Sequence, residues 1–477
     1  MLKSITLENY KSYNNEVSID IKPLTILCGV NSCGKSSIIK SLLMMKQSYE
    51  NNRANGEITY VGDYIDNGSY KSLANKKNKP IKIKNEFELI YNSQADKLMF
   101  RELYRLIFNE NIKSNELNEK YGLFKLSISM EFISNVIKSY EIVINHFLLS
   151  SNIVLTVVRQ DNKKYTISAF GDGEVCSHLP LNSCVQNCEC NFDGIRVISA
   201  YTNEPPIGID VSKFFNFVYG VFRVVSWQYT NDIEHIAPLR FSPHRYHITD
   251  GIYDFVGVSG EYTTQVLNKY CSKKFTNIPI PVNDELLYKT ETEFLSYAVN
   301  QWLNYLDIGE YEITETGDES GNVLKLLINN QNISDVGFGV GQVLPIITQG
   351  LIMKKYQTLM LEQPEIHLHP KAQMKIADFL LSLAINRKNI IVETHSDHII
   401  NRIVRRVMES YGTKNDLSDL VQIYFIYKNN DGYSDVNKEI VIDKYKGLNN
   451  CPSEFFDQYG DELRLIMKLG FDNYRKG

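Results

Sequence analysis

The sequence lacks a long hydrophobic run, an apolar N-terminus and an excess of positive charge. No apolar run approaches the ~20 residues of a membrane-spanning helix, and the opening residues MLKSITLENYKS lack the apolar stretch of a secretion signal. The formal net charge is −5 over 477 residues, so any nucleic-acid contact must use a local basic patch. Hydrophobic residues make up 43% and charged residues 22%, as in soluble globular proteins. We expect a cytoplasmic protein of more than one lobe, with no membrane contact.

Cysteine is also scarce, with eight residues in the chain. In a chain without a secretion signal this usage indicates cytosolic thiols and argues against a disulfide framework. Cys176, Cys184, Cys188 and Cys190 lie with His178 in one short stretch whose side chains could hold zinc. The spacing matches no common zinc pattern, and cysteine is often simply a small buried residue. Buried thiols are therefore the preferred interpretation, and zinc is the alternative.

What the sequence does contain is a phosphate-binding loop. Residues Gly29–Ser36 read GVNSCGKS, which fits GxxxxGK[ST] at every defining position. The apolar run 24–28 precedes it as a buried strand would, and residues 36–45 follow with helical spacing. Glycine lets the loop turn its N–H groups toward a phosphate, and the start of the helix adds partial positive charge. The segment is therefore predicted to be a nucleotide site.

Two residues of this loop have predicted roles in binding. Lys35 would reach the β- and γ-phosphates, and the Ser36 hydroxyl would ligate Mg²⁺. The full set of expected nucleotide contacts from this loop is Gly29, Asn31, Gly34, Lys35, Ser36 and Ser37.

The other half of the site is expected in the C-terminal third of the chain. The buried strand 358–361 ends in Glu362, where nucleotide-hydrolysing folds place a Mg²⁺ partner. A second buried strand, 389–392, is followed by His395, which would lie on the same sheet edge as the phosphate loop. Before both, a glycine-rich turn at 335–342 leads into an apolar helical run that Pro345 interrupts early.

Two basic segments of the chain each allow two interpretations. Lysines recur between residues 71 and 84, and such a run is either a solvated loop or a contact for nucleic acid. Arg240 and Arg245 lie on a proline-broken loop with two histidines, and they either touch phosphate or pair with carboxylates.

These motifs together resemble the ABC-type ATPase heads of the SMC, RecF and OLD group. GVNSCGKS, LMLEQPEIHLHP and ETHSDH occur in the order of that group, and within it EQPEIHLHP, GFGVxQ and ETHS are typical of stand-alone ATPases of bacterial anti-phage defence. The resemblance implies an α/β fold: an ABC-type P-loop ATPase head, with a mixed or parallel sheet flanked by helices and an inserted α+β lobe. It also implies ATP with Mg²⁺ as the ligand.

The resemblance carries roles onto individual residues. Glu362 becomes the Walker B acid and a Mg²⁺ partner, and His395 becomes the switch histidine near the γ-phosphate. The signature motif falls at Gly337–Gln342. Its expected contacts, Gly339, Gly341 and Gln342, would cap the ATP of a second subunit. The working unit would then be a head-to-head homodimer, or a higher oligomer built from it.

Two positions depart from the pattern of the group. Gln363 stands where a glutamate usually polarises the attacking water, and glutamine cannot accept a proton. Either Glu365 or another group serves as the base, or hydrolysis is slow and ATP acts as a long-lived clamp. Gly339 replaces the usual serine of the signature motif, so backbone N–H groups would have to do the capping. Both departures favour a weak ATPase that works as a switch.

Three functions follow from the resemblance. The first is an ATP-gated sensor or clamp in phage defence that engages DNA and controls a separate effector, either a nuclease or a toxin. Only 82 residues follow His395, with no clear DxD pair, so the internal Toprim nuclease of OLD enzymes is not expected. The second is a DNA repair or recombination mediator without a toxic partner. The third, a nucleotide-binding subunit of a transporter, is disfavoured because the signature is not LSGGQ-like.

We divide the chain into four segments on these grounds. They are the N-terminal half of the ATPase head (1–85), an inserted lobe (86–235), a connecting part of the head (236–335) and its C-terminal half (336–477).

Overall fold

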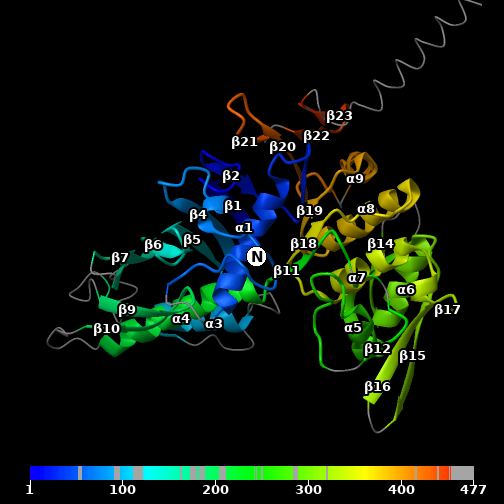
Figure 1. The fold of residues 1–477 in the computed structure, drawn as a ribbon, viewed down its shortest axis with the longest axis horizontal. Helices are drawn as coiled ribbons and strands as arrows, with labels where there is room; N and C mark the ends of the chain where they lie inside the picture. The colour runs from blue at the N-terminus through cyan, green and yellow to red at the C-terminus, as the bar shows by residue number, and fades with distance from the viewer. Residues whose placement is uncertain are drawn as a thin grey trace, which may run out of the picture.

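Two large sheets organise the molecule, and the one that contains β7 (Ile153–Arg159), β9 (Cys188–Asp193) and β10 (Arg196–Tyr201) reaches its left-hand side in Figure 1. They are seen in a computed structural model, which describes residues 1–51, 56–90, 97–110, 122–161, 164–171, 179, 181, 188–202, 211–240, 242, 244–248, 251–282, 288–318, 321–413, 416–437, 440–450 and 452.

The first sheet has six strands in the order β11-β18-β19-β3-β20-β21. Its strands are β11 (Ile233–Ile236), β18 (Thr358–Glu362), β19 (Asn389–Glu393), β3 (Leu24–Gly29), β20 (Val421–Lys428) and β21 (Ser434–Asn437). All pairs are parallel except β20 with β21. Every residue of β18 and β19 is buried, as the continuous apolar runs of the sequence predict for strands covered on both faces.

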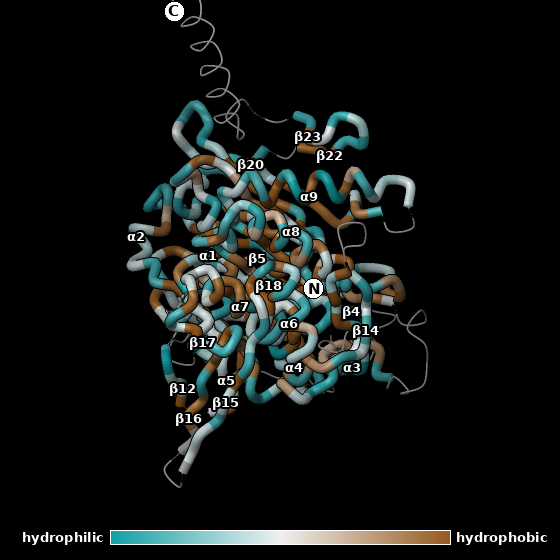
Figure 2. The backbone as a smooth tube through the Cα atoms, turned by 90° about the vertical axis from the view of Figure 1, so that its right-hand side faces the viewer, coloured by the Kyte–Doolittle hydropathy of each residue, from teal (hydrophilic) through white to brown (hydrophobic). Residues whose placement is uncertain are grey.

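Helices cover both faces of this parallel sheet. They are α1 (Lys35–Glu50), α7 (Phe338–Ile352), α8 (Pro370–Ile385) and α9 (Asp397–Ser410). The two faces belong to separate hydrophobic cores: Met360 of β18 packs in the core that contains α1, while Leu359 packs in the core that contains α7 and α8. Figure 2 shows these hydrophobic segments gathered in the middle of the molecule.

The second sheet has nine strands in the order β10-β9-β8-β7-β6-β5-β4-β1-β2, all antiparallel. They are β1 (Leu2–Glu8), β2 (Val17–Asp20), β4 (Ile81–Ile90), β5 (Leu123–Ile133), β6 (Val136–His146), β7 (Ile153–Arg159), β8 (Tyr165–Phe170), β9 (Cys188–Asp193) and β10 (Arg196–Tyr201). Burial alternates along β4 and β5, because only one face of this sheet is covered by the core. The helices α3 (Lys97–Phe108) and α4 (Val211–Thr230) pack on it.

The four segments proposed from the sequence do not follow the sheets. The boundary at 85 falls inside β4, and residues 86–201 extend the sheet that β1 and β2 begin. The boundary at 235 falls inside β11, an edge strand of the parallel sheet. The strands from β5 to β10 therefore continue the N-terminal sheet in space, whereas β11 belongs to the parallel sheet.

The remaining elements lie around these two sheets. They are α2 (Tyr70–Leu73), β12 (His247–Ile248), α5 (Thr263–Tyr270), β13 (Lys274–Pro281), β14 (Tyr288–Phe294), α6 (Leu295–Tyr305), β15 (Tyr311–Asp318), β16 (Gly321–Ile328), β17 (Gln331–Asn332), the 3₁₀ turn η2 (Ile333–Asp335), β22 (Val441–Asp443) and β23 (Gly447–Asn449). The β15–β16 hairpin projects from the body (Figure 1). No helix among the described residues has the length and apolar character needed to cross a membrane.

Two sequence-based expectations about helices need correction. The glycine-rich turn before Val343 is part of α7, which begins at Phe338 and contains Pro345. The sequence pattern of residues 291–305 predicts a helix from about Glu291, but α6 begins only at Leu295, because β14 pairs with β13 up to Phe294. The sequence also predicts a closing helical segment at 452–469, which lies almost wholly outside the described residues.

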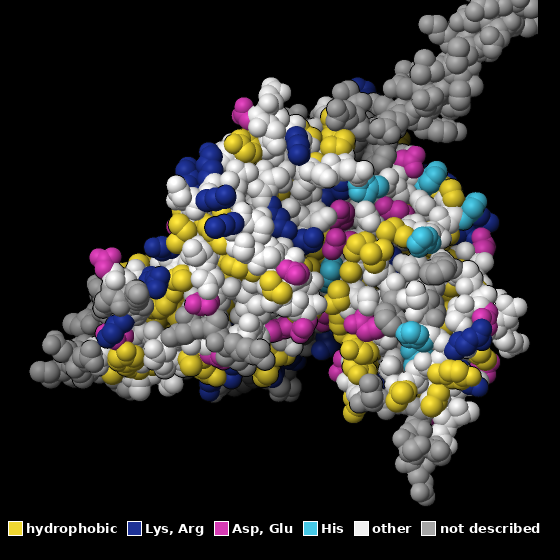
Figure 3. Space-filling model, viewed as in Figure 1, with side chains coloured by type: hydrophobic (Ala, Val, Ile, Leu, Met, Phe, Trp, Pro, Cys, Tyr) yellow, Lys and Arg dark blue, Asp and Glu magenta, His cyan; other side chains and the backbone are white. Residues whose placement is uncertain are grey.

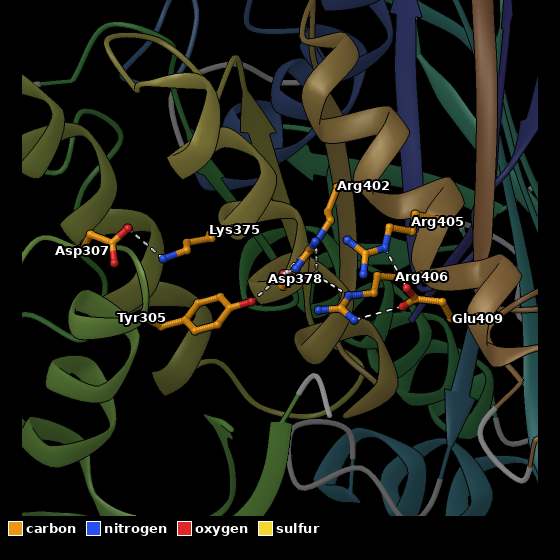
Figure 4. A network of polar contacts seen from close by, with 8 residues as sticks. All are labelled: Tyr305, Asp307, Lys375, Asp378, Arg402, Arg405, Arg406 and Glu409. Carbon is orange, nitrogen blue, oxygen red and sulfur yellow. Dashed lines mark hydrogen bonds and ion pairs between the residues drawn. The ribbon is translucent and has the colours of Figure 1, made fainter. Parts of the chain in front are cut away.

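A buried charge network joins the helices that cover the parallel sheet (Figure 4). Asp378 of α8 is fully buried and accepts hydrogen bonds from Arg402 and Arg406 of α9. The Tyr305 hydroxyl of α6 donates to the same carboxylate at 2.7 Å. Such a network holds three helices in one arrangement, because a buried charge is costly without its partners.

Two of the four cysteines considered as zinc ligands lie within the described residues. Cys188 and Cys190 are free thiols on the buried face of β9, while Cys176 and Cys184 lie outside the described part of the chain, as does His178. Burial raises the pKa of the Cys190 thiol to about 12, and the pKa of Cys188 rises for the same reason. Zinc binds the thiolate, so this environment favours buried, protonated thiols.

Candidate nucleotide site

A pocket of about 530 Å³ lies where β3 ends and α1 begins. Its lining comes from four parts of the chain: the phosphate loop, the loop after β1, the loop after β18 and the end of β19. The lining residues are Ser12, Asn31, Ser32, Cys33, Gly34, Lys35, Ser36, Ser37, Gln363, Glu393 and His395. This is the edge at which parallel strands of an α/β sheet present their ligand-binding loops.

The two glycines of the phosphate loop are there for backbone reasons. Gly29 has φ 138°, and a Cβ on it would come within 2.0 Å of the Ile426 carbonyl oxygen. Gly34 has φ 106° and caps α1 without a side-chain hydrogen bond, so the helix start faces the pocket. A Cβ on Gly34 would meet the hydroxyls of Ser12 and Ser434 at 2.8 Å. Any other residue would distort the loop at both positions.

Neighbouring segments hold this loop in shape. The Tyr13 hydroxyl donates to the Gly34 carbonyl at 3.1 Å, and the Ser434 hydroxyl donates to the Cys33 carbonyl. Lys35 is buried, and its ammonium donates to the carbonyls of Gly29 at 3.0 Å and Val30 at 2.8 Å. The loop is therefore pre-organised, with its lysine folded over it.

Two glutamates end neighbouring strands and face each other in register. Glu362 of β18 pairs with Glu393 of β19. The Ser36 hydroxyl donates to Glu393 Oε1 at 2.9 Å, whereas Glu362 Oε1 lies 2.8 Å from His235 Nε2. The Ser36 hydroxyl is thus hydrogen-bonded to Glu393. Glu393 lines the pocket, whereas Glu362 does not.

Glu393 has an unusual electrostatic environment. Burial raises the pKa of its carboxyl to about 7, and the charge of Glu362 adds to this, while the hydrogen bond from Ser36 opposes it. Its Oε2 atom is buried with no hydrogen-bond partner among the described residues. A carboxylate with one open oxygen beside the Ser36 hydroxyl is a suitable oxygen ligand pair for a divalent cation.

Behind the pocket, Glu365 connects the loop after β18 to the loop after β19. Its carboxylate accepts from the Thr394 hydroxyl at 2.9 Å and from the His395 N–H at 2.7 Å. Burial raises the pKa of Glu365. Both of its oxygens are thus engaged, and it is not among the residues lining the pocket.

Arg240 lies beside both acids of the β18 end. Its Nη2 donates to the Glu362 carbonyl at 2.9 Å, while Nε and Nη1 are buried without a hydrogen-bond partner among the described residues. Burial lowers the pKa of this guanidinium to about 10, against the opposing charges of Glu365 and Glu362. Arg240 therefore supports the acids from behind. Arg245, on the same loop, pairs with the carboxylate of Asp335.

Gln363 and His395 complete the open side of the pocket. Gln363 adopts φ 46°, a left-handed conformation that is strained for a residue with a Cβ, and its N–H donates to the Glu393 carbonyl at 2.7 Å. Burial lowers the pKa of His395, and the charge of Lys35 lowers it further. The imidazole therefore favours its neutral form near the phosphate loop.

The signature segment lies away from this pocket. Gly339, Gly341 and Gln342 are in the first turns of α7, and none of the three lines the pocket. Gly339 approaches the Glu365–His369 loop closely, since a Cβ on it would be 3.0 Å from the His367 carbonyl oxygen. Gln342 is buried with no hydrogen-bond partner for Oε1 among the described residues.

Sequence reasoning missed several residues of the site. Glu393 could have been recognised from the sequence, since it ends a buried strand just as Glu362 does. Only the nearby His395 was assigned a role from the sequence. His235 follows from the position of β11 beside β18, which no local pattern reveals. Of the two roles considered for Arg240, the structure shows it beside the carboxylates of Glu362 and Glu365. Ser12 reaches the pocket because the loop after β1 folds back onto the phosphate loop.

The residues present fit a nucleotide with its magnesium ion. The loop has two glycine positions that no side chain can fill, a lysine and a helix start that lines the pocket, which suit a polyphosphate. The Ser36 hydroxyl and the open Glu393 oxygen are oxygen donors of the kind that Mg²⁺ prefers.

Comparison with known proteins gives distant structural similarities and one family match. Among solved structures, the chain is distantly similar to the SMC head domain from Thermotoga maritima (11% identity, 92% of this chain and 98% of that chain, TM-score 0.36). It is also distantly similar to an SmcHead bound to the C-winged helix domain of ScpA (12% identity, 91% and 96%, TM-score 0.42). A third is the Smc head domain with an extended coiled coil bound to the C-terminal domain of ScpA, derived from Pyrococcus furiosus (11% identity, 91% and 95%, TM-score 0.38). No curated protein matches the chain.

The family comparison is more extensive. The sequence model of the AAA ATPase domain matches residues 1–176 and 268–400, well over half of the 477 residues. The predicted α/β fold with a phosphate-binding loop is confirmed, and ATP with Mg²⁺ is the ligand that such a domain implies. The chain belongs to the AAA ATPase domain family.

Proposed function

We propose that the protein binds ATP, hydrolyses it slowly and acts as a dimeric ATP-gated sensor or clamp in anti-phage defence. In this proposal it engages DNA and controls a separate effector, a nuclease or a toxin. The observation that carries the ATPase part is the single pocket that joins the phosphate loop to Glu393, Gln363 and His395. The defence role and the effector rest on the resemblance of GFGVxQ, EQPEIHLHP and ETHS to defence ATPases.

Each residue of the pocket has a proposed part in binding. Lys35 leaves its loop carbonyls and holds the β- and γ-phosphates, while Ser36 and Glu393 hold the cation, with Glu362 beside them. The bound magnesium ion neutralises charge that develops on the phosphates. His395 donates or accepts a hydrogen bond near the terminal phosphate in its neutral form.

Slow hydrolysis is supported by the groups that face the terminal phosphate. Gln363 lines the pocket and can orient a water by hydrogen bonding, but an amide cannot take its proton. Glu365, considered as the alternative base, uses both oxygens on Thr394 and His395. Glu393 is the carboxylate that lines the pocket, and a cation on it would lower its basicity.

A dimer is supported by the position of the signature segment. Gly337 is the exposed N-cap of α7, so the first N–H groups of this helix are open to an external anion. Because Gly339 and Gly341 do not line the pocket of their own chain, we propose that they cap the ATP of a second copy.

The test compares ATP affinity, ATP turnover and oligomer size among wild type and four variants. Lys35→Ala should weaken ATP binding by about 100-fold or more and abolish ATP-dependent dimers, since it removes the only charged phosphate ligand of the loop. Gln363→Glu should turn over faster than wild type if the missing base limits the rate. Glu393→Gln should raise the Mg²⁺ concentration needed for half-maximal ATP binding, a readout that is independent of turnover.

Lys355→Ala is the matched control, because Lys355 is an exposed lysine that does not line the pocket. Wild type that binds no ATP, or that stays monomeric with ATP bound, would contradict the proposal. A nuclease or toxin gene beside this one would favour defence, and a replication operon would favour the alternative of a DNA repair mediator.

A further inference from the structure

Four exposed lysines, Lys71, Lys76, Lys77 and Lys79, lie on α2 and on the turn that leads from α2 to β4. We call them the lysine surface. Among the residues that the structure describes, none of the four has a carboxylate within 4.0 Å, whereas Lys82 pairs with Glu8 and Glu131 on the adjacent strands. Figure 3 shows basic side chains gathered on this upper part of the molecule, over β2 and β4. The protein carries net charge −5, so the cluster is a local feature.

The turn that carries these lysines is built into the fold. Asn9, with 2% of its surface exposed, donates from Nδ2 to the carbonyls of Lys76 at 3.0 Å and Lys79 at 2.9 Å. Its Oδ1 accepts from the Lys76 N–H at 2.6 Å. The Tyr70 hydroxyl donates to the Lys79 carbonyl at 2.6 Å. A solvated loop would not need a buried side chain on its carbonyls, so the positions of these lysines are specified.

The loop after β1 adds a further cation. The Lys11 N–H donates to the Leu73 carbonyl, and Asn75 donates to the Lys11 carbonyl at 3.0 Å, so this loop and the lysine turn form one unit. Burial lowers the pKa of Lys11 to about 8, and the neighbouring charge of Lys40 lowers it further. An anion placed here would relieve that repulsion between lysines.

The chemistry of the surface favours a phosphate backbone. Lysine is a compact point charge that contacts phosphate without reading bases. No aromatic ring is exposed among the described residues of 1–90, where Val30 and Val61 are the exposed large apolar side chains. Proteins that bind single strands stack the bases on exposed aromatic rings, and no such platform is present. A base-paired duplex, whose bases are already stacked, fits this surface better.

We propose that the lysine surface binds the phosphate backbone of double-stranded DNA without regard to sequence. This inference deepens the proposed function and rests on its DNA-engaging part. The surface is also joined to the nucleotide pocket through the loop after β1: Ser12 lines the pocket and the Tyr13 hydroxyl holds the Gly34 carbonyl. ATP in the pocket and DNA on the lysines would thus contact the same short loop, and each should strengthen the binding of the other.

The test measures binding of the full chain to a labelled duplex of about 30 base pairs over a series of salt concentrations, by fluorescence anisotropy. The variant carries Lys76→Gln, Lys77→Gln and Lys79→Gln, and its dissociation constant should rise about tenfold or more near 100 mM salt. The slope of log affinity against log salt should fall in magnitude by about 2 to 3, since each lost phosphate contact removes about 0.9.

The matched control carries Lys273→Gln, Lys354→Gln and Lys355→Gln, three exposed lysines of another surface with the same change in charge. It should stay within about twofold of wild type. Equal losses in both triple variants would show a diffuse charge effect and overturn the proposal. Tighter binding of duplex RNA or of single-stranded DNA would overturn the assignment to a DNA duplex.

A second variant, Asn9→Ala, changes no charge but removes the side chain that holds the lysine turn. It should weaken DNA binding about two- to fivefold and leave the salt slope within error of wild type. ATP affinity and dimer formation, measured on the same proteins, separate the two proposals. If both persist while wild type fails to bind DNA, the lysine surface assignment is wrong and the ATP-gated dimer stands. If both fail while DNA binding persists, the reverse holds.

Discussion

The two large sheets of this protein differ in how their strands are oriented and in how their faces are covered. In the parallel sheet, β18 and β19 are buried along their whole length, and the polar groups of the site stand at one edge, where these strands end. In the antiparallel sheet, β4 and β5 alternate between a buried face and a more accessible one. The site thus lies at the end of two strands in which every residue is packed, while β4 and β5 of the larger sheet leave about half of their positions open to change.

The helices that cover the sheets differ in the same way. The α4 helix meets the antiparallel sheet with apolar side chains such as Phe217 and Phe222. The helices α8 and α9, over the parallel sheet, contain the buried Asp378 network as well as an apolar core. A charge network gives direction to helix packing that apolar contacts alone do not, and we expect the two halves to respond differently to substitution.

The largest effect is expected from breaking that network. Asp378→Ala leaves Arg402 and Arg406 with a buried charge that has lost its main partner, so the free energy of unfolding should fall by about 3–5 kcal/mol. The measurement is chemical unfolding followed by circular dichroism.

The control for this prediction is the exposed ion pair between Arg405 and Glu409 on α9. Arg405→Ala removes a hydrogen bond to Glu409 whose two side chains are largely in solvent, and it should cost less than about 1 kcal/mol. If the two substitutions cost the same, the buried network has no special role in the helix layer.

The next effect tests the alternation of the two sheets directly. In β18, Leu359→Ala and Met360→Ala should each lower the free energy of unfolding by about 2–5 kcal/mol, since successive residues pack in different cores. In β5, Leu126→Ala should cost a similar amount, but its neighbour Lys125→Ala should stay within about 0.5 kcal/mol. A large loss from Lys125→Ala would show that the outer face of β5 is covered in solution.

A smaller effect is expected in the pH dependence of the unfolding free energy, through Lys388 at the N-terminal end of β19. Lys388 precedes β19, is buried, and donates to the carbonyls of Gly350 at 2.6 Å and Leu351 at 3.1 Å. Burial lowers the pKa of its ammonium to about 7, and the charge of Lys355 contributes. Between pH 7 and the ordinary lysine range the unfolded chain binds this proton and the folded chain does not. The free energy of unfolding should therefore rise with pH in that window. Below it Lys388 is protonated in both the folded and the unfolded chain, so it should add no pH dependence there.

Lys388→Met isolates this contribution. Between pH 7 and pH 9, wild type should gain on the order of 2 kcal/mol of unfolding free energy relative to the variant. Parallel stability curves for the two proteins over that range would contradict the buried position of the neutral amine. Lys388 directly precedes β19 and Glu393 ends it, so this test probes the end of the strand opposite to the nucleotide pocket.

Much of the site could be predicted because its motifs are local. GVNSCGKS, the strand ending at Glu362 and the strand before His395 each carry their own signal, and the structure brings Lys35 and His395 to one pocket. Glu393 was missed because its hydrogen bond to Ser36 links residues 357 positions apart, which depends on strand order. Glu365 was considered as an alternative base because Gln363 departs from the pattern of the group that the sequence resembles, and only the structure shows its carboxylate engaged with the loop after β19.

The fold was predictable to a similar degree and for the same reason. The sequence of residues 153–159 and 165–170 alone predicts two strands, and β7 and β8 have these bounds. Strands β5 to β10 of the expected inserted lobe (86–235) are continuous with the N-terminal sheet, because β4 pairs with both β1 and β5. Such pairing is decided by packing over the whole sheet and leaves no mark in a window of ten residues.

The four-residue strand β11 has a consequence for how the two ends of the site are spaced. Near its start, Lys46 of α1 donates to the carbonyls of Thr230 and Ile233, and at its end His235 holds Glu362 while Arg240 follows. The helix that grows from the phosphate loop and the acid that ends β18 are therefore attached to one short, hydrogen-bonded segment. Any widening of the pocket must carry this segment along, so ligand entry should require motion of the open rim around Gln363 and His395 and not separation of the walls.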